Sequence, residues 1–155
     1  MSKKGTPARR LVTMIVAYAA ALGASAAAWA SADTSPKPGG VYRLKPGIYV
    51  AAGSSCEAPA NAAIRRYDGK GLNTAHSRSC KAAVASRKRS AGAITYTVDQ
   101  NCIDSGAGPG KRFTQRQKVT VEDALTFNQT IGGDRTAYRY CPIDALPADL
   151  RKAAR

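Results

Sequence analysis

The sequence predicts an all-β protein in which an antiparallel meander of about seven or eight strands closes, or nearly closes, into a small barrel. Over most of the chain after residue 40, apolar residues alternate with polar ones, which is the period of a half-buried strand. Short turn sequences separate these segments, so neighbouring strands pair directly. Closure removes the exposed edges of such a sheet, and a two-sheet β-sandwich is the alternative because local strand signals fit both.

The N-terminus has the three-part pattern of an export signal. Four basic residues precede an apolar run over residues 11–22, and small residues follow it. We expect residues 1–32 to be a secretory signal peptide that is cleaved after Ala30 or Ala32. An uncleaved membrane anchor is the alternative, because residues 11–30 approach the roughly 20 residues that span a bilayer. Cleavage places the mature protein in the periplasm or outside the cell, without a stable membrane span.

The remaining chain divides into a leader and one domain. Residues 33–40 include two prolines and two glycines, and we expect them to be a flexible leader. Residues 41–155 form a single disulfide-stapled β domain. Its expected strands, in chain order, are 41–44, 48–50, 63–67, 72–84, 93–103, 119–121, 125–127 and 135–141.

Turn residues mark the reversals between these strands. Asp68-Gly69 and Gly132-Gly133 suit the positive φ angles of tight hairpin turns. Residues 86–92 form the tip between two strands, and residues 104–110 form a glycine-rich loop. After the last strand, apolar residues recur at helical spacing and predict a short C-terminal helix.

Two segments allow more specific structural predictions. Residues 41–44 and 48–50 bracket a Pro-Gly turn, so they form either a hairpin or one kinked strand. Four odd-numbered apolar residues flank a break at residues 122–123 and are expected to share one inward face. They are Val119, Val121, Leu125 and Phe127.

Four cysteines, all in the exported part, allow three disulfide pairings. Cys80 and Cys102 are centred on residue 91, inside the predicted tip, so we expect them to face each other across a hairpin. Cys56 and Cys141 are then left to join the early loop to the last strand. If Tyr138 and Tyr140 face inward, alternation turns Cys141 outward and this second bridge lies on the outer face, unless a β-bulge intervenes.

Charge and composition indicate which classes of partner the protein can bind. The chain holds 24 basic and 10 acidic residues, and removal of the four basic residues of the signal leaves a net charge of +10. Such a surface favours anionic partners, although charge also serves solubility. Large aliphatic residues and Phe are scarce, so we expect most tyrosines to lie in the core rather than to stack nucleic-acid bases.

The first functional hypothesis is an exported, non-enzymatic β-barrel that binds an anionic ligand or envelope polymer at one basic end. We expect the Asp68-Gly69 turn, the 104–111 loop and the Gly132-Gly133 turn to gather at this end, away from Arg87, Lys88 and Arg89. The candidate binding residues are Arg65, Arg66, Lys70, Lys111, Arg112 and Arg135.

Two other classes of function stay open. One is an inhibitor or protective partner of another secreted protein. The other is a small secreted nuclease or hydrolase that uses His76, the one side chain whose ordinary pKa suits proton transfer near neutral pH. Binding is preferred to catalysis because no nucleophile motif is present. We expect no cofactor, and no metal at His76 and Cys80, because exported cysteines are normally consumed by disulfides.

We predict that export removes Trp29, which is the only tryptophan of the chain. The fluorescence of the protein isolated from the exported fraction should then be that of tyrosine. Tryptophan emission from that fraction would instead identify an uncleaved membrane anchor.

Overall fold

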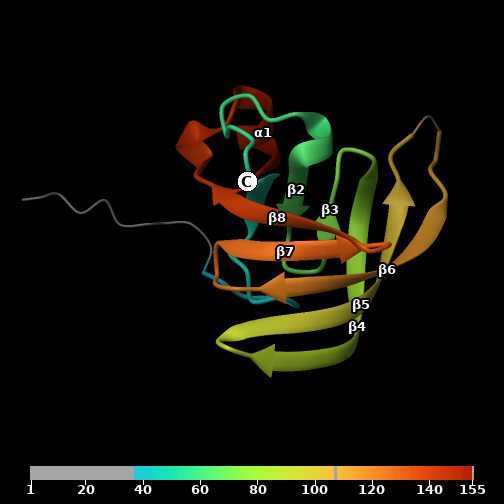
Figure 1. The fold of residues 1–155 in the computed structure, drawn as a ribbon. Helices are drawn as coiled ribbons and strands as arrows, with labels where there is room; N and C mark the ends of the chain where they lie inside the picture. Colours follow the sequence, from blue (N-terminus) through green and yellow to red (C-terminus); the bar gives the residue numbers. More distant parts are fainter. Residues whose placement is uncertain (1–36, 107, 155) are drawn as a thin grey trace, which may run out of the picture. The chain divides into compact units, whose positions relative to one another are not determined.

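The computed structural model describes residues 37–106 and 108–154, and this part of the chain forms one eight-stranded antiparallel sheet (Figure 1). The strand order is β3-β2-β1-β8-β7-β6-β5-β4, so the sheet curls round until its first and last strands meet in a nearly closed barrel. The barrel prediction is confirmed and the sandwich alternative is wrong. The expected signal peptide lies outside the described residues. The strands are β1 (Gly47–Ala51), β2 (Ile64–Tyr67), β3 (Leu72–Asn73), β4 (Ser77–Ser90), β5 (Ala93–Asp104), β6 (Arg112–Val121), β7 (Thr126–Ile131) and β8 (Asp134–Cys141).

The hairpin of β4 and β5 is the longest element of the sheet. A two-residue turn joins the strands, and both of its residues, Ala91 and Gly92, have positive φ angles of 47° and 83°. This geometry matches the twist of the flanking strands. Residues 86–90, expected in the tip, therefore continue β4. Two register shifts, between Arg78 and Lys81 and between Val84 and Ser86, accompany the sharp bend of the hairpin in Figure 1.

The strand expected over residues 72–84 is wrong as a single element. The chain pairs with β2 only at β3, then reverses before β4 begins at Ser77. Thr74 and Ser77 make this reversal by exchanging backbone hydrogen bonds of 3.1 and 3.3 Å. Their hydroxyl oxygens also lie 2.9 Å apart. Side-chain hydroxyls that bond locally offer the backbone an alternative to the ladder, which explains why the strand ends here.

The barrel closes where β3 meets β4. The N–H of Ala82 donates to the carbonyl of Lys70 at 2.9 Å, which is a strand-like bond across the gap. The side-chain amide of Gln100 in β5 supplies two more bonds, because its oxygen accepts from Leu72 N–H and its nitrogen donates to Leu72 C=O, both at 2.9 Å. A methyl group at Gly71 would stand 2.6 Å from the carbonyl oxygen of Cys80, so only glycine allows this approach.

Tyrosines dominate the barrel interior, as the sequence predicts. Five tyrosines are buried there with Phe127, and their rings meet edge-on, tilted or stacked at centroid distances of 5.1 to 5.8 Å. Burial raises the pKa of the Tyr67 phenol to about 12 and raises the pKa of Tyr42 and Tyr49 as well. These phenols therefore stay neutral and contribute packing, and the hydroxyl groups of Tyr49 and Tyr67 also donate hydrogen bonds to backbone carbonyls. The buried tyrosines are Tyr42, Tyr49, Tyr67, Tyr96 and Tyr138.

Two expectations for the interior need correction. Leu125 is 44% exposed, because residues 122–125 form a loop rather than the start of a strand. Residues 41–44 are not a strand either. They form a turn in which the backbone N–H of Tyr42 donates to the Tyr67 hydroxyl at 3.0 Å. Tyr42 and Leu44 are nevertheless fully buried, although neither belongs to a strand of the sheet.

A second, smaller core lies on the outer face of β1 and β8. It surrounds the Cys56–Cys141 disulfide, which is outside the barrel as predicted. The short 3-10 helix η2 (Ile143–Ala145) and the helix α1 (Ala148–Ala153) pack on this face through Leu146 and Leu150, so the short C-terminal helix is confirmed. A further 3-10 helix, η1 (Asn61–Ala63), precedes β2.

Both expected disulfides are present, Cys56 with Cys141 and Cys80 with Cys102. Disulfides of this kind are compatible with an oxidising compartment. Within residues 37–106 and 108–154, no helix has the length and apolar character needed to cross a membrane.

The two disulfides should contribute unequally to stability. They link residues separated by 85 and 22 positions, for which the chain-entropy model gives about 4.5 and 3.4 kcal/mol, respectively. Replacing Cys56 and Cys141 by alanine should therefore lower the free energy of unfolding more than replacing Cys80 and Cys102. Denaturant unfolding of both variants checks the order, and the opposite order would show that loop entropy does not control their effect.

Candidate functional site

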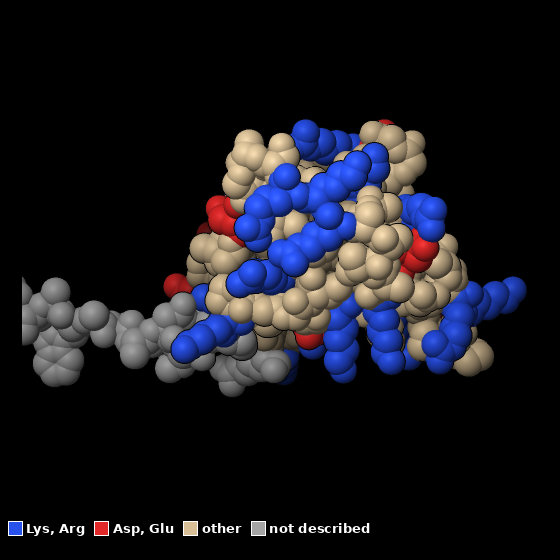
Figure 2. All heavy atoms as spheres, turned by 90° about the horizontal axis from the view of Figure 1, so that it is seen from below, with Lys and Arg blue, Asp and Glu red and all other residues tan. Residues whose placement is uncertain are grey.

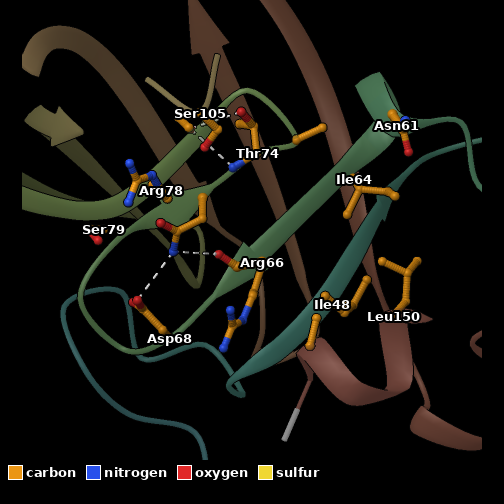
Figure 3. Close-up of a pocket in the computed structure, with 14 residues that line it drawn as sticks. Ile48, Asn61, Ile64, Arg66, Asp68, Thr74, Arg78, Ser79, Ser105 and Leu150 are labelled. Carbon is orange, nitrogen blue, oxygen red and sulfur yellow. Dashed lines mark hydrogen bonds between the residues drawn. The ribbon is translucent and has the colours of Figure 1, made fainter. Parts of the chain in front are cut away.

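A pocket of about 420 Å³ opens on the outer face of the barrel, between β2, the β3–β4 turn and α1. Figure 3 shows Ile48, Ile64 and Leu150 on one side of it, Arg78 on the other, and Arg66 between them beside Ile48. The pocket thus has one apolar wall and one cationic, hydroxyl-rich wall. Its volume lies within the range of small-molecule sites, and most of its lining residues are polar or charged.

Strand alternation places the side chains of this pocket. In β2, Ile64 and Arg66 point to the outer face, and Arg65 and Tyr67 point into the barrel. Ile48 lies opposite Arg66 in the register of β1 and β2, so the two side chains stand on the same face. The packing of α1 on that face adds Leu150 to the apolar wall.

The cationic wall contains guanidinium N–H groups that are available to donate hydrogen bonds. Among the described residues, the Arg66 guanidinium has no hydrogen-bond or ion-pair partner. Arg78 donates one hydrogen bond of 3.2 Å, from Nη2 to the carbonyl oxygen of Pro109. Planar guanidinium groups suit carboxylate and phosphate oxygens because they donate two parallel hydrogen bonds.

Asp68 is the acidic residue of the pocket lining, but its carboxylate is already engaged. Oδ1 accepts from the backbone N–H groups of Lys70 and Gly71 at 2.9 and 3.2 Å. Oδ2 accepts from Asn73 Nδ2 at 3.3 Å, as the dashed line in Figure 3 shows. This carboxylate fixes the turn after β2 and leaves both arginines available to a ligand.

The backbone of Ser79, at the rim of the pocket, has an unusual conformation. Its φ angle is 53°, in the left-handed region that non-glycine residues seldom occupy, and it falls within the register shift between Arg78 and Lys81. Such a conformation costs roughly 1–3 kcal/mol, and residues of this kind cluster at functional sites as well as in turns such as that at Ala91. With Ser77, Thr74 and Ser105, Ser79 surrounds the cationic wall with hydroxyl groups.

The candidate residues chosen from the sequence do not form one site. Arg66 lines the pocket, but Arg65 lies inside the barrel, where Nε donates to Gln129 at 2.8 Å and the guanidinium covers the Tyr138 ring at 4.8 Å. Burial lowers the pKa of Arg65. The other four candidates occupy separate places: Lys70 is in the turn after β2, Lys111 and Arg112 are at the start of β6, and Arg135 is at the start of β8.

The expected grouping of turns is wrong for the Asp68-Gly69 turn. Tyr67 pairs with Gly47, and Lys45 N–H donates to Ala124 C=O at 2.8 Å, so the Asp68-Gly69 turn lies at the end that carries the 122–125 loop. The 105–111 loop and the Gly132-Gly133 turn lie towards the opposite end. The unpredicted reversal between β3 and β4 adds one turn to the meander. Successive turns lie at opposite ends of a meander, so the added turn moves the Asp68-Gly69 turn to the end opposite the expected one.

His76 is exposed in the β3–β4 turn. Its backbone N–H donates to Thr74 Oγ1 at 3.1 Å, and its carbonyl accepts from Ser105 N–H at 2.9 Å, so the residue helps to shape the pocket rim through its backbone. In the part of the chain that the structure describes, no three His, Cys, Asp or Glu side chains gather in a way that could hold a metal ion.

Arg66 is the one candidate binding residue that lines the pocket, and sequence reasoning missed the others, among them Arg78, Ser79 and Leu150. Arg78 and Ser79 reach the pocket because β4 begins only after the reversal at residues 74–76. Leu150 was expected in a terminal helix, but helical spacing does not show where that helix packs. A Thr-x-x-Ser pattern at Thr74 and Ser77 was the one available signal for the turn.

The chain was compared with protein-family models, with curated proteins and with solved structures, and no match was found in any of the three comparisons.

Proposed function

We propose that this protein is an exported, non-enzymatic binding module whose pocket takes a small amphipathic anion. The ligand class is a molecule with an apolar chain or ring and one carboxylate or phosphate group. The observation that carries the proposal is the unpartnered Arg66 guanidinium, which lines one pocket together with the apolar side chains of Ile48, Ile64 and Leu150.

The two walls suit the two parts of such a ligand. Burial of its apolar part stabilises the complex by roughly 25 cal/mol for each Å² removed from water. Its anionic group can accept charge-assisted hydrogen bonds from Arg66 and Arg78, which are stronger than hydrogen bonds between neutral groups. The hydroxyl groups of Thr74 and Ser79 can satisfy the remaining oxygen atoms.

The covalent frame and the charge support the same proposal. Two disulfides, together with the signal-like N-terminus, favour a periplasmic or secreted protein that meets its ligand outside the cytoplasm. The excess of basic residues attracts anions to the surface, which raises the rate of encounter. Within residues 37–106 and 108–154, His76 makes hydrogen bonds only through its backbone, so we propose binding rather than the nuclease or hydrolase alternative.

The pocket predicts a defined selectivity. The protein should bind octyl phosphate or octanoate, and octanol should bind at least about tenfold more weakly, because it lacks the charge that Arg66 and Arg78 recognise. Arg66→Gln should weaken binding of octyl phosphate by about tenfold to a hundredfold, which is the cost of losing hydrogen bonds to a charged group. Calorimetric titration measures both effects.

Lys70→Gln and Arg112→Gln remove the same charge outside the pocket lining and serve as matched controls. Each control should change the affinity less than about threefold at moderate ionic strength, because salt screens distant exposed charges. Equal losses in Arg66→Gln and in the controls, or binding of octanol as tight as that of octyl phosphate, would contradict the proposed site.

A further inference from the structure

The outer half of β4 is an unpaired strand edge. Every residue from Ala83 to Ser90 is exposed, and β5 is the only strand that pairs with them in the described part of the chain. The strand-like bonds that close the barrel end at Ala82. Val84 shows the effect on a side chain: it is 45% exposed, although Val98 directly opposite is fully buried.

The turn at the end of this hairpin determines which backbone groups are free. Ser90 and Ala93 flank a two-residue turn, so they exchange hydrogen bonds with each other. Hydrogen-bonded and non-hydrogen-bonded pairs alternate along an antiparallel ladder. The N–H and C=O groups of Arg87 and Arg89 therefore point away from β5, towards the open edge.

The same edge is strongly basic. Arg87, Lys88 and Arg89 follow one another, and β4 contains no acidic residue. Figure 2 shows the molecule from below the view of Figure 1, the side on which β4 lies, and basic side chains far outnumber acidic ones there. Arg87 and Arg89 share a face with Tyr96 and Ile94, and the Arg87 guanidinium lies 5.6 Å from the centre of the Tyr96 ring.

Charge decides which strand can occupy this edge. A second copy would bring its own three cations to the pairing, and cations on an edge strand are a common protection against such self-association. The N-terminal segment of the chain is also basic, through Lys3, Lys4, Arg9 and Arg10. An extended acidic segment of another protein has the opposite charge and supplies the missing ladder partners.

We propose that residues 86–90 of β4 bind an extended, glutamate- or aspartate-rich segment of another protein by adding it as a ninth strand. The segment pairs its backbone with the free groups of Arg87 and Arg89, and carboxylates at alternate positions meet both guanidinium groups on one face. Cross-strand pairs of opposite charge contribute roughly 0.2–1 kcal/mol each, so backbone pairing and charge are both needed. This surface is separate from the pocket of Arg66 and acts independently of it.

The test uses a fluorescent peptide in which glutamate alternates with threonine and valine. A second peptide has the same sequence but carries N-methyl groups on alternate backbone amides, so its charge is unchanged while one edge can no longer donate hydrogen bonds. Anisotropy should show binding of the first peptide and at least about tenfold weaker binding of the second. Amide exchange at Arg87 and Arg89 should slow in the presence of the first peptide only.

Protein variants separate this edge from diffuse charge. Arg87→Gln with Arg89→Gln should weaken peptide binding by about tenfold, whereas Arg112→Gln with Arg135→Gln, which removes equal charge elsewhere, should change it less than about threefold. Equal affinity for the N-methylated peptide, equal losses in the two double variants, or no binding of the first peptide would overturn the proposal. Concentration-dependent self-association through β4 would also overturn it, because a second copy would then be the occupant.

Discussion

The closure of the barrel between β3 and β4 is the constraint on which the rest of the structure depends. β3 has only two residues, so a backbone ladder alone cannot join the edges of the sheet. Side chains complete the seam: Gln100 bonds both backbone groups of Leu72, and Asn73 Oδ1 accepts from Cys80 N–H at 3.0 Å. Each buried backbone group left unpaired would cost about 1–3 kcal/mol, so these side chains substitute for a strand.

The shortness of β3 also creates both candidate interaction surfaces. The reversal at residues 74–76 places Arg78 and Ser79, at the start of β4, in the lining of the same pocket as Arg66. Beyond Ala82, β5 is the one strand in the described part of the chain that pairs with β4, so the other side of its outer half is left as an open edge. A longer β3 would extend the ladder, cover this edge and move the pocket wall.

Scarcity of large aliphatic residues shapes the interior. Rings of tyrosine fill the barrel, and a polar chain of Arg65, Gln129 and Gln117 crosses it, with 2.8 Å and 2.5 Å hydrogen bonds to and from Gln129. The polar chain is only partly satisfied, because Gln117 Nε2 and the nearby Tyr42 hydroxyl are buried without a hydrogen-bond partner among the described residues. The two disulfides and the outer core around Cys56–Cys141 add stability that packing inside the barrel does not supply.

Much of the fold was predictable from local patterns, because alternation and turn residues act over a few positions. The cysteine pairing followed from the symmetry of Cys80 and Cys102 about one turn. The reversal at Thr74–Ser77 was missed because hydroxyl side chains, not Gly or Pro, make that turn. Because this turn was missed, the Asp68-Gly69 turn was expected at the wrong end of the barrel. The residues of the proposed pocket therefore could not be brought together from the sequence.

The most direct test of this account replaces Gln100 by methionine, which keeps the length of the side chain but removes both bonds to Leu72. We expect the free energy of unfolding to fall by about 2–4 kcal/mol and the Leu72 amide to exchange faster, because two buried backbone groups lose their partners. Gln115→Met is the matched control, since Gln115 lies opposite Gln100 and is only partly buried. Equal, small effects of the two substitutions would contradict side-chain closure of the barrel.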